Sequence, residues 1–590
     1  MKKTLLICMS AFCCISCQKT PEVRNSATPD TVSGVQLIVW NDYHSTLYEA
    51  VSKNTPDIAL GGLPVWMATV EALKQNTSDP VMLLDAGDMF QGATPLNELK
   101  GMGMVEIMNA VGLDATTFGN HEFDYGRSEA RGDDPQGALK DAMAQSQFAW
   151  VSANVVSDGE TESWPPETLK PYTILQKGPY RIAVTGVTTT ETPVATSAHN
   201  ITGIRFEQAA SSLEKVLPMI QEEKPDFTIV LAHVTGEPTP MPAFNQIATD
   251  ATFDHELGEI MALPQELRDQ IDLIVTGHLH ISFLYDNGKT FITQGKSNSK
   301  ELTTLRLVPK ADGKGLEIDR GSVQKYELSH TPIYKGCAGG YDHPDKLAVG
   351  GLTITPDTRG YEMTSRFEAG MSENLCDVMA CTTEPLLRNN EGESAVGNLV
   401  TDASRIAFAE SDGAILNAGG LRIDWPKGEL YRELISAMMP FDNYAYLVDM
   451  SGQEIIDVLR LLSSGHHHGV VQVSGIAYKV QTKCERPPED INQDGSAEDW
   501  EMSCLCSGPT INGQPIEPQK RYKIVMSDFL YNGGDSIKGI LKTSQILEKG
   551  PLMKRTIMDY VSSQKACFGN ADLINPQAPR ITVGPCDTFL

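Results

Sequence analysis

Basic residues are scarce in this chain. Its 590 residues include 48 Lys and Arg against 76 Asp and Glu, which gives a formal net charge of −28. Nucleic acids and anionic lipids both favour positively charged protein surfaces. We therefore expect neither a nucleic-acid polymer nor an anionic membrane surface as a partner. A small anionic substrate would need local cations, and bound metal ions can supply them.

Long apolar runs are also missing, apart from one near the N-terminus. The stretch from Leu5 to Ile15 is apolar and follows Lys2 and Lys3, which is typical of a secretory signal and too short for a permanent membrane span. Because a small residue precedes Cys17, as at bacterial lipoprotein cleavage sites, residues 1–17 are predicted to be a lipoprotein-type signal peptide with Cys17 lipidated. A plain signal peptide is the alternative.

Residues 18–34 are predicted to be a flexible tether. The mature protein is then expected to be exported, as a periplasmic or outer-membrane-anchored lipoprotein of a Gram-negative-type bacterium. The lipid would be its only membrane contact. The oligomeric state is left open.

The cysteines lack the spacings of metal-binding fingers. Eight follow the predicted signal peptide, at positions 337, 376, 381, 484, 504, 506, 567 and 586. An even number in an exported chain indicates disulfides. From proximity along the chain, the expected pairs are Cys376 with Cys381, Cys484 with Cys504 or Cys506, and Cys567 with Cys586.

The chain is too long for one hydrophobic core, so two large domains are expected. Residues 35–330 alternate strand-like and helical stretches, which predicts an α/β domain. Residues 331–370 are rich in Gly, Pro, Asp and Thr and are predicted to be a linker or an insertion. Residues 371–590 are predicted to form a second, mixed α/β domain, in which the run His466-His467-His468 would be an exposed loop.

Five strand-like runs in the first domain each lead into a short cluster of acid, histidine or amide side chains. The runs are Val35 to Trp40, Val81 to Leu84, Ala115 to Phe118, Phe227 to Leu231 and Ile271 to Val275. The clusters are Asp42-Tyr43-His44, Gly87-Asp88, Gly119-Asn120-His121-Glu122, His233 and Gly277-His278-Leu279-His280. Active sites of α/β sheets form at the carboxyl ends of strands. Taken singly each cluster is usually a turn or a hydrogen-bonded side chain, but together they predict a site for two metal ions.

Hydrolysis of a phosphate ester needs a strong nucleophile and positive charge on the phosphoryl oxygens. Two metal ions roughly 3.5–4 Å apart provide both, through a bridging water of lowered pKa. Asp88 is expected to bridge the two ions, and His121, oriented by Asp124, to act as an acid or charge stabiliser. One ion would be held by Asp42, His44 and His280, and the other by Asn120, His233 and His278. Zn, Mn, Fe and Co all suit such oxygen and imidazole ligands.

This ordered set resembles the calcineurin-like metallophosphoesterases, and more narrowly the bacterial 5′-nucleotidase/UDP-sugar hydrolase group. Further matching segments are Gly61-Gly62-Leu63, Asp85-Ala86-Gly87-Asp88-x-x-Gln91-Gly92, Ser152-Ala153-Asn154 and Thr188-Thr189-x-Glu191-Thr192-Pro193. The resemblance implies a four-layer α/β/β/α sandwich, the division of ligands given above, and His121 with Asp124 as the catalytic pair.

The second half resembles the substrate-binding domain of the same family. The matching segments are Gly397-Asn398-Leu399-x-x-Asp402-Ala403, Asn417-Ala418-Gly419-Gly420-Leu421-Arg422, Pro440-Phe441-Asp442-Asn443 and Asp528-Phe529-Leu530-x-x-Gly533-Gly534-Asp535. The resemblance implies that Arg422 binds phosphate, that Phe441 and Phe529 stack on a base, and that Asp535 accepts from ribose. Asn417, Gly420 and Asn443 complete the expected substrate-binding set.

Two features of the second half leave alternatives open. The family pattern usually has a further arginine where Gly392 stands, and the nearby Arg388 would be its substitute. If the second half does not bind a nucleotide, Phe441 and Phe529 would be core residues, and the glycines of the matching segments would form turns.

Residues 490–501 fit a twelve-residue calcium loop. Its ligands would be Asp490, Asn492, Asp494 and Glu501, and the calcium would be structural. An acidic surface loop is the alternative.

The residues predict an exported dinuclear-metal phosphatase with a metal-bridging water, and the resemblance implies that it hydrolyses nucleotides. A 2′,3′-cyclic nucleotide phosphodiesterase, a UDP-sugar hydrolase or a sulfur-ester hydrolase would use the same scaffold. A non-catalytic, nucleotide-binding surface lipoprotein is the alternative from another class.

Overall fold

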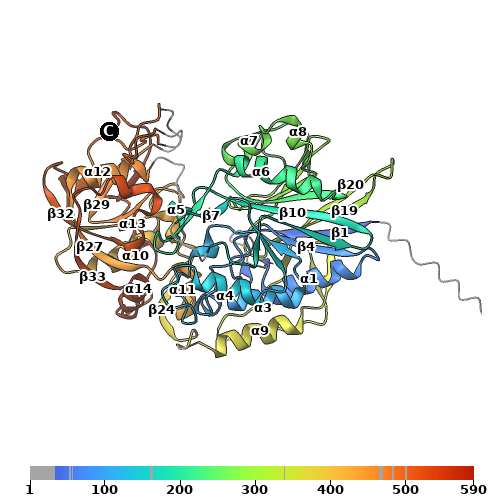
Figure 1. The fold of residues 1–590 in the computed structure, drawn as a ribbon. Coiled ribbons are helices and arrows are strands. Elements are labelled where there is room, and N and C mark those ends of the chain that lie inside the picture. The colour runs from blue at the N-terminus through green and yellow to red at the C-terminus, as the bar shows by residue number, and fades with distance from the viewer. Residues whose placement is uncertain are drawn as a thin grey trace, which may run out of the picture.

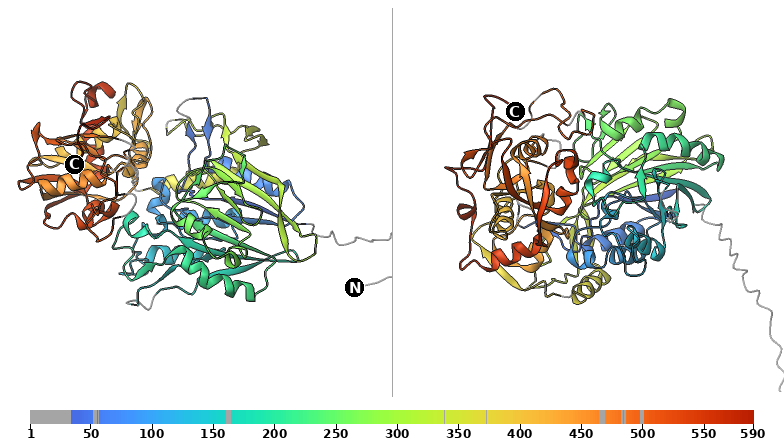
Figure 2. Two further views of the ribbon diagram at one scale, coloured as in Figure 1. Left: turned by 90° about the horizontal axis from the view of Figure 1, so that it is seen from above. Right: turned by 60° about the vertical axis from the view of Figure 1, so that its left-hand side comes forward.

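The structure, a computed structural model, describes residues 34–590 except 52–54, 56, 160–163, 338, 372, 464–468, 482, 483, 485 and 498–500. The predicted signal peptide, Cys17, the tether up to residue 33 and the run His466-His467-His468 lie outside the described residues. Figures 1 and 2 show two domains that touch along one side. No helix in the described residues is long and apolar enough to cross a membrane.

Two seven-stranded sheets form the centre of the first domain. In spatial order, one contains β20 (Leu316–Glu327), β19 (Glu301–Pro309), β1 (Val35–Trp40), β4 (Val81–Asp85), β5 (Ala115–Thr116), β6 (Ala149–Val151) and β8 (Leu169–Lys170). The other contains β14 (Ile247–Ala248), β17 (Phe283–Asp286), β18 (Phe291–Gln294), β16 (Leu273–Thr276), β12 (Phe227–His233), β10 (Tyr180–Thr188) and β9 (Tyr172–Lys177). Strands β1, β4, β5 and β6 run parallel, as do β10, β12, β16 and β18, so their carboxyl ends share one edge of each sheet.

Alternating side chains place each sheet between two apolar layers. On β1, Leu37 and Val39 pack between the sheets, whereas Ile38 and Trp40 pack against helices. The helices α1 (Leu63–Gln75), α3 (Met102–Val111) and α4 (Gly137–Gln145) cover the first sheet, and α6 (Ala209–Glu222) and α7 (His255–Met261) cover the second (Figure 1). This is the four-layer α/β/β/α sandwich that the resemblance implies, and that prediction is confirmed.

The segment 331–370, expected to be a linker or an insertion, packs on the first domain. It contains a hairpin, β22 (Leu347–Val349) with β23 (Leu352–Ile354), and the helix α9 (Thr358–Ala369). Helix α9 lies beside α1 (Figure 1), and Tyr361, Met363 and Phe367 from it join the core of the first domain. The side chain of Asp357 caps the helix by accepting a hydrogen bond from the backbone N–H of Arg359.

The second domain is mixed α/β, as expected. Its five-stranded sheet contains β28 (Gln472–Ser474), β25 (Gly413–Leu416), β32 (Arg521–Ser527), β27 (Tyr444–Ser451) and β33 (Gln545–Leu552). Helices α10 (Ala395–Ile406), α11 (Arg432–Met438) and α14 (Met553–Ser562) cover one face, and α12 (Gly452–Leu461) and α13 (Asp528–Tyr531) the other.

Disulfides pair all eight cysteines that follow the predicted signal peptide. The pairs are Cys337–Cys376, Cys381–Cys567, Cys484–Cys504 and Cys506–Cys586. The predicted bond between Cys484 and Cys504 is confirmed, whereas the predicted pairs Cys376–Cys381 and Cys567–Cys586 are wrong.

The two wrong pairings have a topological cause, because the end of the chain returns to distant strands. The backbone N–H of Phe568 donates to the carbonyl of Cys381 at 3.1 Å, which places Cys567 beside β24 (Val378–Thr382). The backbone N–H of Ser507 donates to the carbonyl of Thr588 at 3.0 Å, which aligns the segment carrying Cys586 with Cys506. Proximity along the chain was therefore a poor guide.

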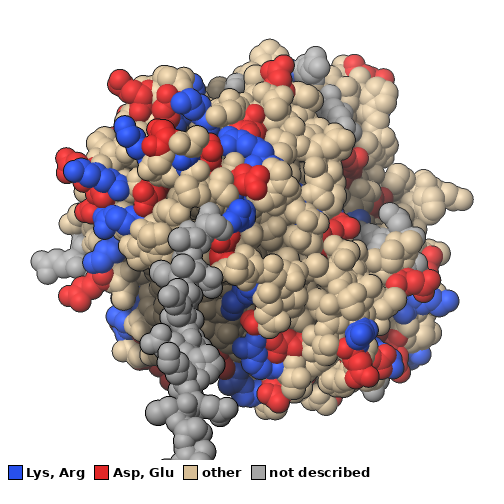
Figure 3. All heavy atoms as spheres, turned by 90° about the vertical axis from the view of Figure 1, so that its right-hand side faces the viewer, with Lys and Arg blue, Asp and Glu red and all other residues tan. Residues whose placement is uncertain are grey.

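The surface shows no gathering of basic side chains on the face drawn in Figure 3. Lys and Arg are interspersed with Asp and Glu there, over the end of the first domain that lies away from the second.

Candidate metal centre and substrate site

The seven predicted metal ligands come from one edge of the sandwich. Asp42 and His44 follow β1, Asp88 follows β4 and Asn120 follows β5. From the other sheet, His233 ends β12, and His278 and His280 follow β16. The site therefore straddles both sheets.

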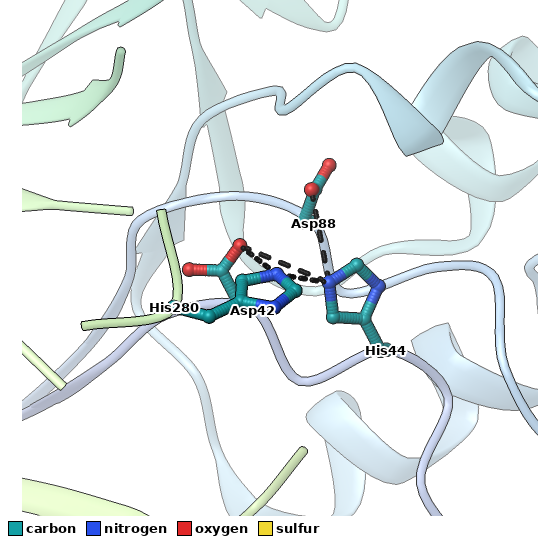
Figure 4. Close-up of side chains that lie close together, drawn as sticks. All are labelled: Asp42, His44, Asp88 and His280. Carbon is teal, nitrogen blue, oxygen red and sulfur yellow. Dashed lines mark hydrogen bonds and ion pairs between the residues drawn. The ribbon is translucent and has the colours of Figure 1, made fainter. Parts of the chain in front are cut away.

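Four of these side chains converge around one point (Figure 4). Asp42, His44, Asp88 and His280 offer donor atoms that all lie within 4.8 Å of one another. Nε2 of His44 lies 2.9 Å from Nε2 of His280 and 3.9 Å from Oδ2 of Asp88. Nε2 of His280 lies 3.3 Å from Oδ1 of Asp42.

Asp88 also belongs to a second group, with His233 and His278, whose donor atoms lie within the same 4.8 Å. Nε2 of His233 lies 3.1 Å from Oδ2 of Asp88. Asp88 is thus the carboxylate that the two groups share. The two groups together contain six of the seven predicted ligands, and Asn120 is the seventh.

The donor atoms fit metal ions. Nδ1 of His233 lies 2.9 Å from the carbonyl of Ala86, and because a carbonyl only accepts, Nδ1 carries the proton. Burial lowers the pKa of His233, but the carboxylate of Asp88, 3.1 Å from Nε2, outweighs it and raises the pKa to about 10. The site thus favours a positive charge between these two atoms, which either a proton or a metal ion can supply. Oδ1 of Asn120 is buried and receives no hydrogen bond from the described residues. Burial and the neighbouring His280 lower the pKa of His44 well below its usual range, which keeps the ring in its neutral, ligating form.

Backbone strain is concentrated at the same residues. Five of the seven predicted ligands have positive φ angles: Asp42 (51°), His44 (50°), Asp88 (56°), His278 (83°) and His280 (58°). Each such residue costs on the order of 1–3 kcal/mol, and such strain clusters at binding and catalytic sites. Such strain at neighbouring residues is typical of a binding or catalytic site.

Glu122 organises the loops of the site, a role that the motif alone did not suggest. Its buried carboxylate accepts hydrogen bonds from the backbone N–H groups of Asp88 (3.0 Å), Met89 (2.8 Å), Phe90 (3.2 Å) and Gly119 (2.6 Å). It joins the loop after β4 to the loop after β5. A second carboxylate, Glu256, joins the loops after β10 and β12 through Thr190 and Thr235.

His121 and Asp124 form the hydrogen-bonded pair that was predicted from the sequence. Nδ1 of His121 lies 2.6 Å from Oδ2 of Asp124, and the hydroxyl of Thr196 donates to Oδ1 of Asp124 at 2.7 Å. The His121 ring centre lies 5.3 Å from that of His44 and 6.1 Å from that of Phe441 in the second domain. Burial alone would lower the pKa of His121, but the carboxylates of Asp124 and Asp88 outweigh it and raise the pKa. His121 thus lies between the metal ligands and the second domain.

Arg422 of the second domain also faces this centre. Its guanidinium lies 5.7 Å from the ring centre of Phe441 and donates to the carbonyl of Gly419 at 3.3 Å. Burial lowers the pKa of Arg422, as does the nearby Arg388, while the charges of Asp88, Asp124 and Asp42 oppose the shift. No carboxylate of the described residues lies within ion-pair distance of its guanidinium.

Arg388 lies close enough to Arg422 for their like charges to oppose one another. Nη1 of Arg388 donates to the carbonyl of Leu421 at 2.9 Å, and Nε lies 3.5 Å from Asp424. Gly392, where the family pattern has an arginine, instead has Asn389 and Val583 as neighbours.

The two predicted base-stacking residues lie at the domain boundary. Phe441 contacts His121 and Arg422, as given above. Phe529 and Asn443 line a small cavity of about 40 Å³ together with the segment around α5 (Thr192–Ala195) of the first domain. This is well below the roughly 150 Å³ of a cavity that binds benzene. A nucleobase cannot enter beside Phe529 unless α5 and the second domain move apart.

Asp535 is buried and carries a positive φ of 50°. Burial raises the pKa of Asp535 to about 7, and a hydrogen bond with the side chain of Asn417 partly offsets the increase. Asn417 comes directly before the turn that contains Gly420, where a Cβ would lie 3.3 Å from Oδ1 of Asn417. Asp535, Asn417 and Gly420 therefore form one local group.

The predicted calcium loop folds back on itself. Asp490 accepts from the backbone N–H groups of Asp494 (3.1 Å) and Gly495 (3.2 Å), and Glu501 accepts from that of Asn492 (2.8 Å). Among the described residues, the carboxylates of Asp490, Asp494 and Glu501 do not converge within 4.8 Å as those of the metal centre do. Calcium binding at these residues stays a prediction.

Two family models match the chain. One, described as calcineurin-like phosphoesterase, matches residues 36–282, and the other, described as 5′-nucleotidase, C-terminal domain, matches residues 375–542. The first lies within the four-layer sandwich and the second within the mixed domain. The resemblance stated from the motifs is thereby confirmed.

Individual relatives and a solved structure agree with this pairing of domains. A cell wall protein of Listeria monocytogenes is 27% identical over 579 residues, which cover 92% of this chain and 68% of that protein. The 5′-nucleotidase of Rattus norvegicus is 23% identical over 561 residues, which cover 90% of this chain and 88% of that protein. The crystal structure of a 5′-nucleotidase precursor from Thermus thermophilus has a TM-score of 0.70 at 21% identity, covering 94% of this chain and 100% of that one, and shows the same fold.

Proposed function

The chain belongs to the metal-dependent phosphoester hydrolases that join a calcineurin-like phosphoesterase domain to a 5′-nucleotidase C-terminal domain, and from this we propose that it removes phosphate from nucleotides. The observation that carries the choice of substrate is the position of Arg422. A cation without a carboxylate partner among the described residues faces a cluster of metal-binding side chains from the opposite domain. A phosphate bound between the two domains would pair with the charge of Arg422 and with those of the bound metal ions.

The metal-binding residues divide between two divalent cations in this proposal. Asp42, His44, Asp88 and His280 would hold one, and Asp88, Asn120, His233 and His278 the other. The cations would lower the pKa of an attacking water and neutralise the phosphoryl oxygens. Zn, Mn, Fe and Co remain the candidates, because the donors are oxygens and imidazole nitrogens without thiolate.

His121 acts on the substrate from the side of the second domain. The hydrogen bond with Asp124 fixes Nδ1 and leaves Nε2 for the substrate. The ring lies between His44 and Phe441, so Nε2 can hydrogen-bond to a phosphoryl or leaving-group oxygen. We assign His121 to charge stabilisation at the reacting phosphate and Asp124 to its orientation.

The second domain holds the rest of the nucleotide. Arg422 binds the phosphate as a planar fork, and we assign Arg388 as a second cation because it lies beside Arg422. Phe441 and Phe529 stack on the base. Asp535, with Asn417, accepts from the ribose hydroxyls.

Turnover requires the two domains to move. The cavity of about 40 Å³ between Phe529 and α5 is too small for a base, yet Arg422 already faces the metal-binding residues. The arrangement therefore suits a closed state, and entry of the nucleotide needs separation at α5.

We also propose that the protein is exported and carries a lipid on Cys17. The support for this is the apolar stretch from Leu5 to Ile15.

A substrate panel tests the proposal directly. Purified protein loaded with Mn²⁺ is assayed for phosphate release from AMP and UMP, and for cleavage of a 2′,3′-cyclic nucleotide, a UDP-sugar and a sulfur-bearing ester. We expect the highest kcat/KM for a nucleoside monophosphate. A higher kcat/KM for another member reassigns the substrate. Nucleotide binding without any hydrolysis, by protein that contains its metals, supports a binding lipoprotein instead.

A further inference from the structure

A lysine and a glutamate form an ion pair that is fully buried in the first domain. Nζ of Lys325, on β20, lies 2.7 Å from Oε1 of Glu301, the first residue of β19, and both side chains are 0% exposed. Burying an ion pair adds little net stability, because the cost of removing both charges from water offsets their attraction. A stabilising role alone therefore does not explain the pair.

The contacts of the pair cross from one sheet to the other. Lys325 donates from Nζ to the main-chain carbonyl of Gln294, the last residue of β18 in the opposite sheet. The hydroxyl of Ser282 donates to Oε1 of Glu301 at 2.8 Å, and Ser282 lies two residues beyond His280. The pair thus connects strands β19 and β20 to the end of β18 and to the loop that contains His280.

A neighbouring asparagine extends this connection to Asp42. Nδ2 of Asn41 donates to the carbonyl of Gly295 at 2.9 Å, and the backbone N–H of Gly295 donates to Oδ1 of Asn41 at 2.7 Å. Nδ2 of Asn41 also donates to Oδ2 of Asp42 at 2.5 Å. Gly295 directly follows Gln294, whose carbonyl Lys325 holds. Asp42 of one sheet is therefore oriented by a residue that is anchored on the other.

We propose that Lys325 and Glu301 are positioning residues that hold the two sheets in register at the metal edge. Asp42 and His280 come from different sheets and must meet at one ion, and the ion pair fixes the segments behind both. The inference rests on the proposed metal site but not on the identity of the substrate. Neither residue touches the reacting atoms.

The test compares a charge-removing variant with a matched control. Lys325→Met removes the buried charge, and Lys140→Met removes another buried lysine, whose Nζ lies 2.8 Å from Asp134 on the helical side of the domain. Full-length protein is stripped of metal with a chelator and titrated with Mn²⁺ while its Tm is followed, and bound manganese is counted by mass spectrometry. KM and kcat for AMP are measured at saturating Mn²⁺.

We expect Lys325→Met to raise the Mn²⁺ concentration needed for half of the Tm shift by about 10-fold or more, the effect typical of partners behind metal ligands. KM for AMP should change little, and Lys140→Met should leave the Mn²⁺ midpoint unchanged. An unchanged midpoint in Lys325→Met, or an equal shift in Lys140→Met, overturns the proposal.

A double variant covers the case in which Lys325→Met does not fold. Lys325→Met with Glu301→Met removes both charges and leaves no buried charge unpaired. We expect it to fold and still to need about 10-fold more Mn²⁺. A wild-type midpoint in the double variant overturns the positioning role. If the wild-type protein binds Mn²⁺ but does not hydrolyse AMP, the proposed function fails while this test still decides the role of the pair.

Discussion

Gly119 leaves no room for a side chain next to Asp88: a Cβ at this position would lie 2.1 Å from Oδ1 of Asp88. The same Cβ would lie 2.7 Å from Nε2 of His233. The glycine before Asn120 is therefore required by the close approach of ligands from both sheets. The metal site therefore requires a glycine at position 119 as well as the ligands themselves.

Gly119→Ala should therefore weaken metal binding. The added methyl group must displace Asp88 or His233, and such overpacking costs about 1–3 kcal/mol in stability. We expect activity to fall by about 100-fold, with less bound metal by mass spectrometry. Gly584→Ala is the control, because a Cβ there meets nothing within 4 Å. Normal metal content in Gly119→Ala would show that the loop adapts.

Asp124→Asn separates the orientation of His121 from metal binding. The amide keeps the shape of the carboxylate, but it loses the charge that faces Nδ1 of His121 at 2.6 Å. We expect kcat to fall by about 10- to 100-fold while the metal content stays unchanged. Asp133→Asn, at an exposed position, should leave both quantities as in the wild type. A wild-type kcat in Asp124→Asn would remove Asp124 from the catalytic pair.

The pH dependence of stability should report on Asp535. Its pKa is about 7 in the folded protein against an ordinary value of 3.8. The proton that the folded state retains stabilises the fold at low pH, and this contribution is lost as pH rises from 3.8 through about 7. The loss is on the order of a few kcal/mol at pH 8.

Asp535→Asn should accordingly raise Tm at pH 8 and reduce the fall in Tm between pH 5 and pH 8. The same variant should raise KM for AMP, because the ribose loses a charged acceptor. Asp559→Asn on the surface of α14 is the control, with a wild-type pH profile. If Asp535→Asn lowers Tm equally at both pH values, the carboxylate is not an unfavourable buried charge.

Replacement of Phe529 tests base stacking. A stacked base contributes about 1–3 kcal/mol, so Phe529→Ala should raise KM for AMP by roughly 5- to 150-fold. KM for ribose 5-phosphate, which has no base, should change little. The exposed Phe244→Ala serves as the control. An equal rise in KM for both substrates would indicate that Phe529 shapes the domain boundary rather than binding the base.

The sequence predicted those parts of the fold that local patterns encode. The run Val35 to Trp40 is β1, and the run Phe227 to Leu231 lies within β12, as expected. The ligand clusters could be found because each follows a strand. Parallel strands then bring the clusters to one edge without any knowledge of distant contacts.

Pairings between distant residues could not be predicted in the same way. Cys381 and Cys567 are 186 residues apart, and only the return of the chain end to β24 brings them together. In the sequence, Lys325 and Glu301 look like other charged residues, which usually lie on the surface. Their burial depends on the contacts of β18 with β19 and β20. The hairpin and helix α9 within residues 331–370 were likewise not predicted, because the turn-forming residues on either side of α9 indicate a linker or an insertion.

The most direct measurement is phosphate release from AMP by metal-loaded wild-type protein and by Asp88→Asn. Asp88 is shared by both groups of ligands, so its loss should remove both sites while most of the remaining structure is kept. We predict about two bound ions and steady phosphate release in the wild type, and neither in Asp88→Asn. Hydrolysis at the wild-type rate by Asp88→Asn would contradict the account of the metal centre.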